Sequence, residues 1–109
     1  MANYLLVETR DPFDSADVNH VYELAEGLVD QANEVTVFLV QNGVFPTRKA
    51  SAAGGRVTAL AGKATVLADE FSLRERGIRP EELAEGVRPV SIDTLVDLAV
   101  DSGRRVVWH

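Results

Sequence analysis

The side chains that could carry chemistry are few in this sequence. It has two histidines, His20 and His109, and neither stands at the spacing from other ligands that a metal site needs. No serine lies in a G-x-S-x-G elbow, and no glycine-rich phosphate-binding motif is present. The chain has no cysteine, which excludes a thiol nucleophile and thiolate metal ligands. The sequence therefore predicts no catalytic residue, no metal site and no cofactor.

Polar side chains do follow two apolar runs that are typical of strands. Gln41 and Asn42 come directly after residues 35–40, and Asp69 comes directly after residues 64–68. Ligands of open parallel sheets bind at the carboxyl ends of the strands. We therefore expect these three residues to form the wall of any ligand-binding pocket.

Two further residues complete this candidate site if the strands are ordered as in flavodoxin. Thr9 follows the first expected strand and would lie beside Asn42 and Asp69. Arg48 would reach over them and balance the charge of Asp69. A simpler interpretation stays open, in which Asn42 and Gly43 form only a turn and Asp69 only caps a helix. On the residues alone, the cap is the favoured interpretation of Asp69.

Alternating strands and helices must position these residues. Short apolar runs predict strands, and apolar residues at three- and four-residue spacing predict the helices between them. Residues 35–40 are apolar except for Thr36, which suits a strand buried on both faces in the middle of a parallel sheet. The pattern predicts a single domain over residues 1–109. We expect a flavodoxin-like, three-layer α/β/α arrangement with a mostly parallel sheet of four or five strands.

Two segments carry more specific local signals. Small residues over 47–53 predict a short helix, which the pair Gly54 and Gly55 would end. Residues 87–90 predict a short strand at an edge of the sheet or only a strand fragment, because Pro89 has no N–H to donate to a second neighbour.

Composition and charge narrow the function classes. Eleven basic and seventeen acidic residues give a formal charge of -6, which disfavours binding to nucleic acid. Polar residues interrupt every apolar run well before the length of about 18 residues that a membrane-spanning helix requires. The first residues lack the pattern of a signal peptide. We therefore expect a cytoplasmic protein that binds neither nucleic acid nor membrane.

Three segments resemble motifs of one known family. The segment VQNGVF at residues 40–45 resembles a strand that ends in QDGV and an aromatic residue, and residues 65–78 resemble a strand and helix that close on ARG and an aliphatic residue. Residues 90–98 and the final Val107 and Trp108 resemble the end of one branch of that family. The chain thus resembles the DsrE/DsrF/DsrH family of small cytoplasmic sulfur-relay proteins, which includes TusB, TusC and TusD. The branch that residues 90–98, Val107 and Trp108 resemble is DsrH/TusB.

The resemblance implies a loss of the family's chemistry in this chain. In the DsrE/TusD branch a persulfide-carrying cysteine stands eight residues before the glycine of the RG pair, and counting back from Gly77 reaches Asp69. A carboxylate cannot carry a persulfide. TusB-like members also commonly lack this cysteine and serve as structural partners, so the resemblance implies a DsrE-like fold and an oligomer.

The leading hypothesis is a non-catalytic, sulfur-relay-like subunit that acts through assembly. Its partners would be further copies, as a trimer or hexamer, or cysteine-bearing relatives, with Phe45, Phe71 and Trp108 contributing to the interface. The alternative is a protein that binds a small ligand at the carboxyl edge of the sheet. An enzyme that uses Asp69 as a general base ranks last, because no second convergent group accompanies it.

Overall fold

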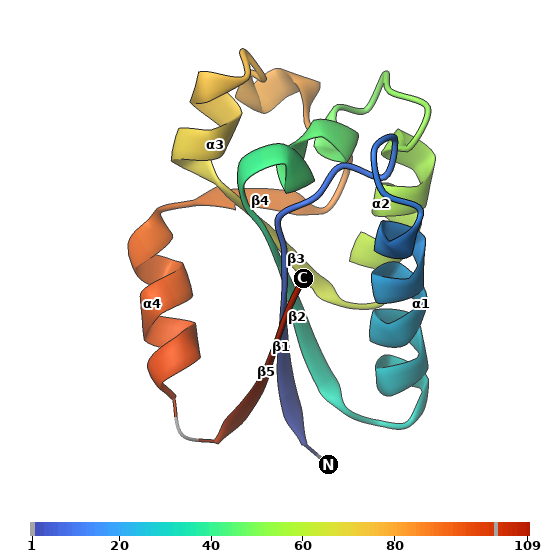
Figure 1. Cartoon of the computed structure of the whole chain (residues 1–109), viewed down its shortest axis with the longest axis vertical. Helices are drawn as coiled ribbons and strands as arrows, with labels where there is room; N and C mark the ends of the chain where they lie inside the picture. Colours follow the sequence, from blue (N-terminus) through green and yellow to red (C-terminus); the bar gives the residue numbers. More distant parts are fainter. Residues whose placement is uncertain (1, 102) are drawn as a thin grey trace.

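The five strands that the structure describes lie in one parallel sheet. The computed structural model describes residues 2–101 and 103–109, and Figure 1 shows the arrangement of the elements. The strands follow the spatial order β4-β3-β2-β1-β5. The strands are β1 (Asn3–Glu8), β2 (Glu34–Leu39), β3 (Thr65–Asp69), β4 (Val87–Val90) and β5 (Arg104–Trp108). The α-helices are α1 (Asp17–Asp30), α2 (Gly54–Ala61), α3 (Glu70–Glu75) and α4 (Ile92–Val100), and two 3-10 helices are η1 (Gln41–Thr47) and η2 (Pro80–Glu82).

Strand β2 occupies the centre of the sheet. It pairs with β1 on one side and with β3 on the other, and Val37, Phe38 and Leu39 are fully buried. Alternate side chains of a strand point to opposite faces, so burial of three consecutive residues requires cover on both faces. The prediction that this apolar run forms an inner strand is confirmed.

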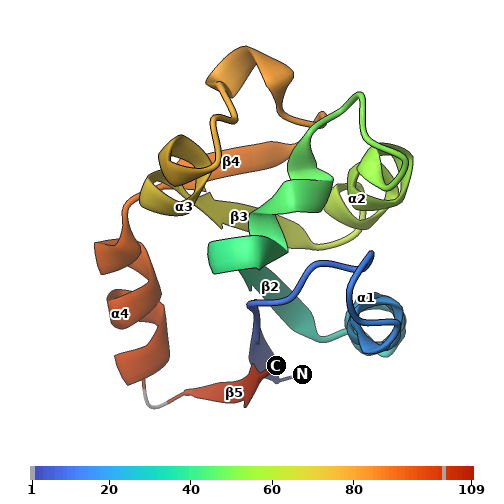
Figure 2. The ribbon, with the colours of Figure 1, turned by 45° about the horizontal axis from the view of Figure 1, so that its top comes forward.

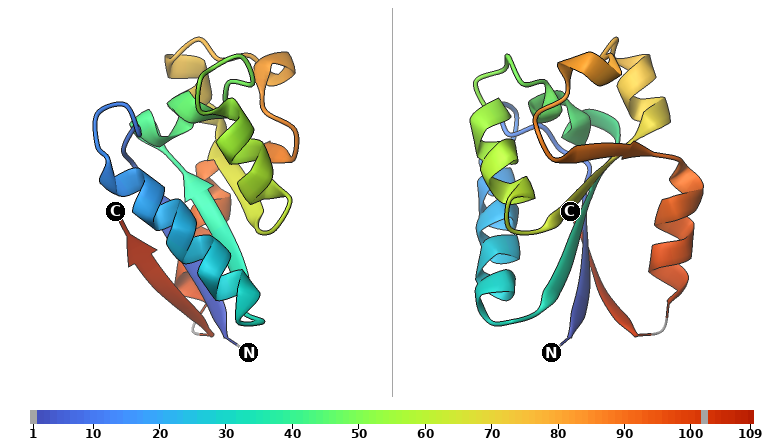
Figure 3. Two further views of the ribbon diagram at one scale, coloured as in Figure 1. Left: turned by 90° about the vertical axis from the view of Figure 1, so that its right-hand side faces the viewer. Right: turned by 180° about the vertical axis from the view of Figure 1, so that it is seen from behind.

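Helices cover both faces of the sheet. On one face, α1 and α2 pack against the strands through a large apolar cluster, to which Val18, Tyr22 and Leu60 belong. On the other face, Leu95 of α4 packs with a smaller cluster that includes Phe38 of β2. The two views of Figure 3 show α1 and α2 on one side and α4 on the opposite side. The predicted three-layer α/β/α fold class is confirmed.

The strand order has one reversal point. From β1 the chain proceeds through β2 and β3 to β4 in one direction, and it then returns by way of α4 to β5, which lies beside β1. The order is therefore not that of flavodoxin itself, 2-1-3-4-5, although the layers are of that class. As a result the end of β2 neighbours that of β3, whereas the end of β1 neighbours that of β5.

The segment after β2 differs from the expectation. Residues 47–53 were predicted to form a short helix that Gly54 and Gly55 end, and this prediction is wrong: η1 spans Gln41–Thr47 and the glycine pair begins α2. A Cβ atom on Gly54 would lie 2.7 Å from the carbonyl oxygen of Lys49. Gly54 is thus required for close packing of the backbone at the start of the helix, not for its end.

The two edge strands of the sheet are β4 and β5. As predicted for the strand with Pro89, β4 pairs with a single neighbour, β3. Among the described residues, no helix is both long and apolar enough to cross a membrane.

Candidate functional site

Asp69 is a buried carboxylate at the end of β3. Its side chain accepts hydrogen bonds at Oδ2 from the backbone N–H of Ser72 (3.0 Å) and from the hydroxyl of Ser72 (2.7 Å). Only 6% of the residue is exposed. Asp69 therefore caps α3, as the sequence predicted, because its side chain satisfies an N–H group that has no partner within the helix.

Ser72 connects this cap to the end of the neighbouring strand. Its hydroxyl oxygen accepts a hydrogen bond from the backbone N–H of Gln41 (2.8 Å) while its proton is donated to Asp69. Gln41 has a positive φ of 52°, so the left-handed residue of this turn is Gln41 and not the Asn42 or Gly43 that the sequence suggested. The chain from the Gln41 N–H through Ser72 to Asp69 orients α3 relative to η1, which Figure 2 shows side by side.

Arg76, at the end of α3, covers the same edge. Its Nε and Nη2 donate to Oδ1 of Asn42 (3.2 and 3.0 Å), and its Nη1 donates to the carbonyl oxygen of Ser72 (3.2 Å). The guanidinium carbon also lies 5.6 Å from the centre of the Phe45 ring, within the range of a cation–π contact. Three hydrogen bonds and one aromatic face hold this positive charge in place.

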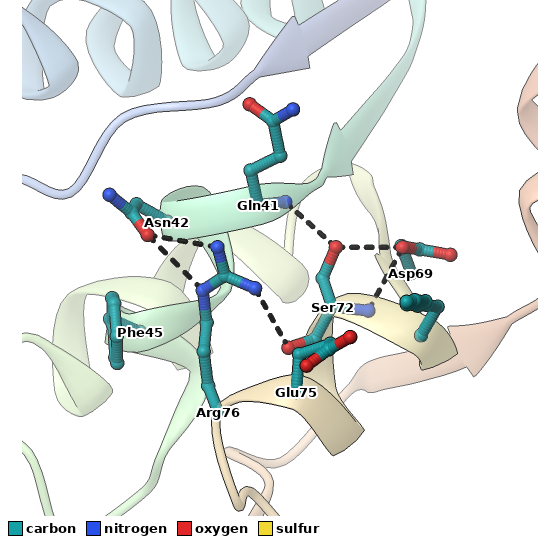
Figure 4. Close-up of a pocket in the computed structure, with 8 residues that line it drawn as sticks. Gln41, Asn42, Phe45, Asp69, Ser72, Glu75 and Arg76 are labelled. Atoms are coloured by element: carbon teal, nitrogen blue, oxygen red, sulfur yellow. Dashed lines mark hydrogen bonds between the residues drawn. The ribbon is translucent and has the colours of Figure 1, made fainter.

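These groups line an open pocket of about 570 Å³ (Figure 4). Its lining residues come from η1, from the end of β3 and from α3: Gln41, Asn42, Phe45, Asp69, Phe71, Ser72, Glu75 and Arg76. Oδ1 of Asp69 is buried and has no hydrogen-bond partner among the described residues. The pocket thus combines a fixed guanidinium with the partly exposed rings of Phe45 and Phe71, whereas the Oδ1 of Asp69 is closed to solvent.

The structure brings three of the five predicted site residues together. Gln41, Asn42 and Asp69 line the pocket, but Thr9 and Arg48 do not. Thr9 lies at the end of β1, where its hydroxyl donates to the carbonyl oxygen of His109 (2.9 Å). The expectation that Thr9 adjoins the other residues assumed a flavodoxin order, in which β1 and β3 are neighbours, and here β2 separates them.

Arg48 was expected to balance the charge of Asp69, and the structure corrects this. Its Nε lies 3.5 Å from Oε2 of Glu82, and its backbone forms an isolated bridge with Leu83. The seven residues of η1 carry Arg48 beyond the pocket. The cation at the pocket is instead Arg76, which sequence reasoning missed together with Ser72. Ser72 follows Asp69 by three residues, and Arg76 follows Ser72 by four. This spacing is typical of residues on one face of a helix and could have placed them together.

The two histidines have different surroundings. His20 is exposed on α1, with Nδ1 3.8 Å from Oδ1 of Asp17. His109 instead contacts the buried carboxylate of Glu8, a link that sequence spacing did not reveal. Within the described part of the chain, no three His, Cys, Asp or Glu residues are grouped to hold a metal ion.

Comparison with known proteins supports the fold. The chain matches the crystal structure of the ychN protein from E. coli with a TM-score of 0.89 and 18% identity, over 100% of both chains. It matches MTH1491 from Methanobacterium thermoautotrophicum, a protein of unknown function, with a TM-score of 0.87 and 22% identity, again over 100% of both. It also matches BT1422 from Bacteroides thetaiotaomicron, a conserved protein of unknown function, with a TM-score of 0.80 and 11% identity, over 98% of this chain and 94% of the other.

No family model matches the sequence, and no curated protein matches it. The structural matches define a class of small α/β chains that share this architecture from end to end. At these identities they establish the fold alone.

Proposed function

We propose that this chain is a non-catalytic, cytoplasmic subunit of the DsrE/DsrF/DsrH type, closest to the DsrH/TusB branch, and that it acts through assembly. Its partners would be further copies of itself, as a trimer or hexamer, or cysteine-bearing relatives. The end-to-end structural match and the three sequence motifs support the family. The chain has no cysteine, and Asp69 stands where the resemblance places the persulfide carrier.

The observation that carries the proposal is the apolar surface on β5. Trp108 is 62% exposed, and Val106 and Val107 are also exposed. Within the described residues β5 pairs only with β1, so the backbone N–H and C=O groups of its outer edge have no strand beside them. An exposed apolar strand at a sheet edge is a site where another chain can pair.

The opposite edge of the sheet lacks these properties. Strand β4 carries Arg88 and Pro89 in its middle, and a charge and a missing N–H both discourage pairing with another strand. Trp108 pairs in register with Val7, whose side chain belongs to the cluster on the α4 face. On α4 itself Ile92 and Val100 are exposed. The face that carries α4 and β5 is therefore the favoured contact surface.

Light scattering coupled to size-exclusion chromatography tests this proposal. We expect an oligomer at tens of micromolar, a range in which weak interfaces begin to fill. The double variant Val106→Glu/Trp108→Glu should shift the protein toward a monomer. Leu24→Glu on α1 is the control, because Leu24 is an apolar residue on the other face whose exposed fraction (43%) is close to that of Val106 (44%). A monomeric wild-type protein that also captures no cysteine-bearing relative would contradict the proposal.

A persulfide donor tests the sulfur-relay part separately. Intact mass measurement should show no sulfur adduct on the wild-type chain, which has no thiol. In Asp69→Cys, the new thiolate can attack the donor's outer sulfur, form a Cys–S–SH group and release the donor as a thiol. We expect this variant to gain one sulfur atom, and Glu23→Cys on the exposed face of α1 to gain it more slowly. Equal rates would show that position 69 is not the family's active position.

A second candidate function is small-ligand binding at the pocket, which the fixed guanidinium of Arg76 favours. Arg76 can donate a hydrogen bond, and Phe71 offers an exposed ring for stacking. Nicotinamide, a planar amide, is a suitable probe. Binding should shift the backbone NMR resonances of residues 41–45 and 69–76, and Arg76→Ala should abolish the shifts. Equal shifts in the variant would contradict this candidate.

A further inference from the structure

A second buried carboxylate, Glu8, contacts His109 at the ends of β1 and β5. Glu8 is fully buried, and its Oε1 and Oε2 lie 2.8 and 2.9 Å from Nδ1 of His109. Oε2 also accepts a hydrogen bond from the backbone N–H of Arg10 (3.0 Å). The two residues are 101 positions apart in the sequence. Figure 1 shows the carboxyl terminus at the middle of the molecule, beside the strands.

The backbone on both sides of this contact is fixed. The N–H of His109 donates to Val7 (2.8 Å), and its carbonyl oxygen accepts from the backbone N–H and the hydroxyl of Thr9 (3.1 and 2.9 Å). The carbonyl oxygen of Glu8 accepts from the N–H of Val40 (3.1 Å). Gly43 packs so closely on it that an added Cβ would approach this oxygen to 2.3 Å. The imidazole is therefore oriented by an ordered frame.

This geometry selects one tautomer of His109. An ionised carboxylate only accepts hydrogen bonds, so Nδ1 must carry the proton that both oxygens of Glu8 share. In the neutral imidazole, Nε2 then keeps its lone pair. Among the described residues no group forms a hydrogen bond with Nε2, and 23% of the His109 side chain is exposed. A carboxylate that holds one nitrogen of an imidazole makes the other a better acceptor.

The pair lies at a point in the sheet where ligands of open α/β folds commonly bind. Strand order reverses between β1 and β5, and in open α/β sheets ligands bind outside the carboxyl ends of strands at such a reversal point. Glu8 is the last residue of β1, and His109 directly follows β5. The pocket at Asp69 lies instead over the ends of β2 and β3, where no reversal occurs.

We propose that Glu8 and His109 form a proton-accepting site for a neutral small molecule that carries a weakly acidic O–H or N–H group. The ligand donates this group to Nε2 of His109. On full transfer the X–H bond breaks, an N–H bond forms at Nε2, and the electron pair stays on X. The resulting imidazolium is balanced by the carboxylate of Glu8. Glu8 is a positioning residue, since it acts through His109. This site is independent of assembly through β5.

Heteronuclear NMR of the imidazole nitrogens tests the tautomer. In the wild-type protein we expect neutral His109 with a proton on Nδ1 and none on Nε2. Glu8→Gln preserves the shape of the side chain, and its amide can donate to Nδ1, so the proton should move to Nε2. His20, which is exposed on α1, serves as the internal control and should be unchanged. A wild-type His109 protonated on Nε2 would overturn the proposal without reference to any variant.

Para-nitrophenol, a weakly acidic O–H compound, tests the ligand class. It should shift the Nε2 resonance of His109 in the wild-type protein and leave His20 unaffected. Glu8→Gln should weaken its binding by about tenfold or more, the cost typical of removing a partner that orients a metal-binding histidine. A purely structural contact predicts equal binding in both proteins, and that result, or a shift at His20 equal to that at His109, would overturn the proposal.

Discussion

Two buried carboxylates at the same end of the sheet are held in opposite ways. Asp69 is bound by Ser72, three residues further along the chain, whereas Glu8 is bound by His109 from the other end of the chain. A contact over three residues forms as soon as the first turn of α3 forms. A contact over the length of the chain exists only when β1 and β5 are neighbours. The first contact could be foreseen from local sequence and the second could not.

The largest effect should follow loss of the long-range contact. Glu8→Ala removes a fully buried carboxylate and leaves the Arg10 N–H and the His109 Nδ1 without an acceptor. Leaving a buried donor without an acceptor costs about 1–3 kcal/mol, so with two such donors we expect the free energy of unfolding in urea to fall by about 3 kcal/mol. Glu23→Ala on the exposed face of α1 is the control and should change little. A loss no larger than the control's would show that Glu8 contributes no structural contact.

Gly43→Ala tests the packing behind the same residue. A Cβ at this position would lie 2.3 Å from the carbonyl oxygen of Glu8, so the backbone must shift. We expect a loss of about 2 kcal/mol in the free energy of unfolding, within the range for overpacked sites. Gly55→Ala in α2 is the matched control, because nothing lies within 4 Å of its added Cβ. That control should be stabilised, since alanine favours a helix over glycine.

The local contact should cost less to remove. Asp69→Ala deletes the cap of α3, and we expect a loss of about 1 kcal/mol. Asp97→Ala on the exposed face of α4 is the control. Ser72→Ala removes part of the same interaction, so the double variant should lose less than the sum of the single ones. Strict additivity would show that the cap and the serine act independently.

The smallest effect concerns alkaline pH. Burial, followed by the charge of Glu8, raises the pKa of Tyr22, whose hydroxyl has no hydrogen-bond partner among the described residues. Above the ordinary tyrosine value of about 10 the unfolded chain releases this proton while the folded protein retains it. Stability should therefore be unaffected by this group below pH about 10 and should decrease above it.

Tyr22→Phe separates this contribution from general alkaline denaturation. The variant should equal the wild type, or slightly exceed it, at neutral pH, because a buried hydroxyl without a partner is unfavourable. It should lose less stability than the wild type between neutral and alkaline pH in urea titrations. Identical alkaline losses would show that Tyr22 ionises equally in both states.

Local sequence signals predicted only part of the pocket. Gln41, Asn42 and Asp69 follow apolar runs, so their place at the ends of strands could be predicted. Arg76 could not be assigned in place of Arg48, because that choice depends on the path of η1 over the sheet. The start of α2 was missed for a related reason. Gly54 packs against the backbone of Lys49, and the spacing of apolar residues in the sequence does not reveal this contact.

The sequence by itself determined the alternation of strands and helices, the central buried strand, the cap at Asp69 and the impossibility of thiol chemistry. These follow from the spacing of apolar residues, from contacts within one helical turn and from composition, which are all local quantities. Only the tertiary structure decided the strand order, and with it which strand ends meet. That order depends on the packing of α1, α2 and α4 on the two faces of the sheet. Because β5 returns to β1, His109 reaches Glu8. Because β2 lies between β1 and β3, Thr9 stands apart from Asp69.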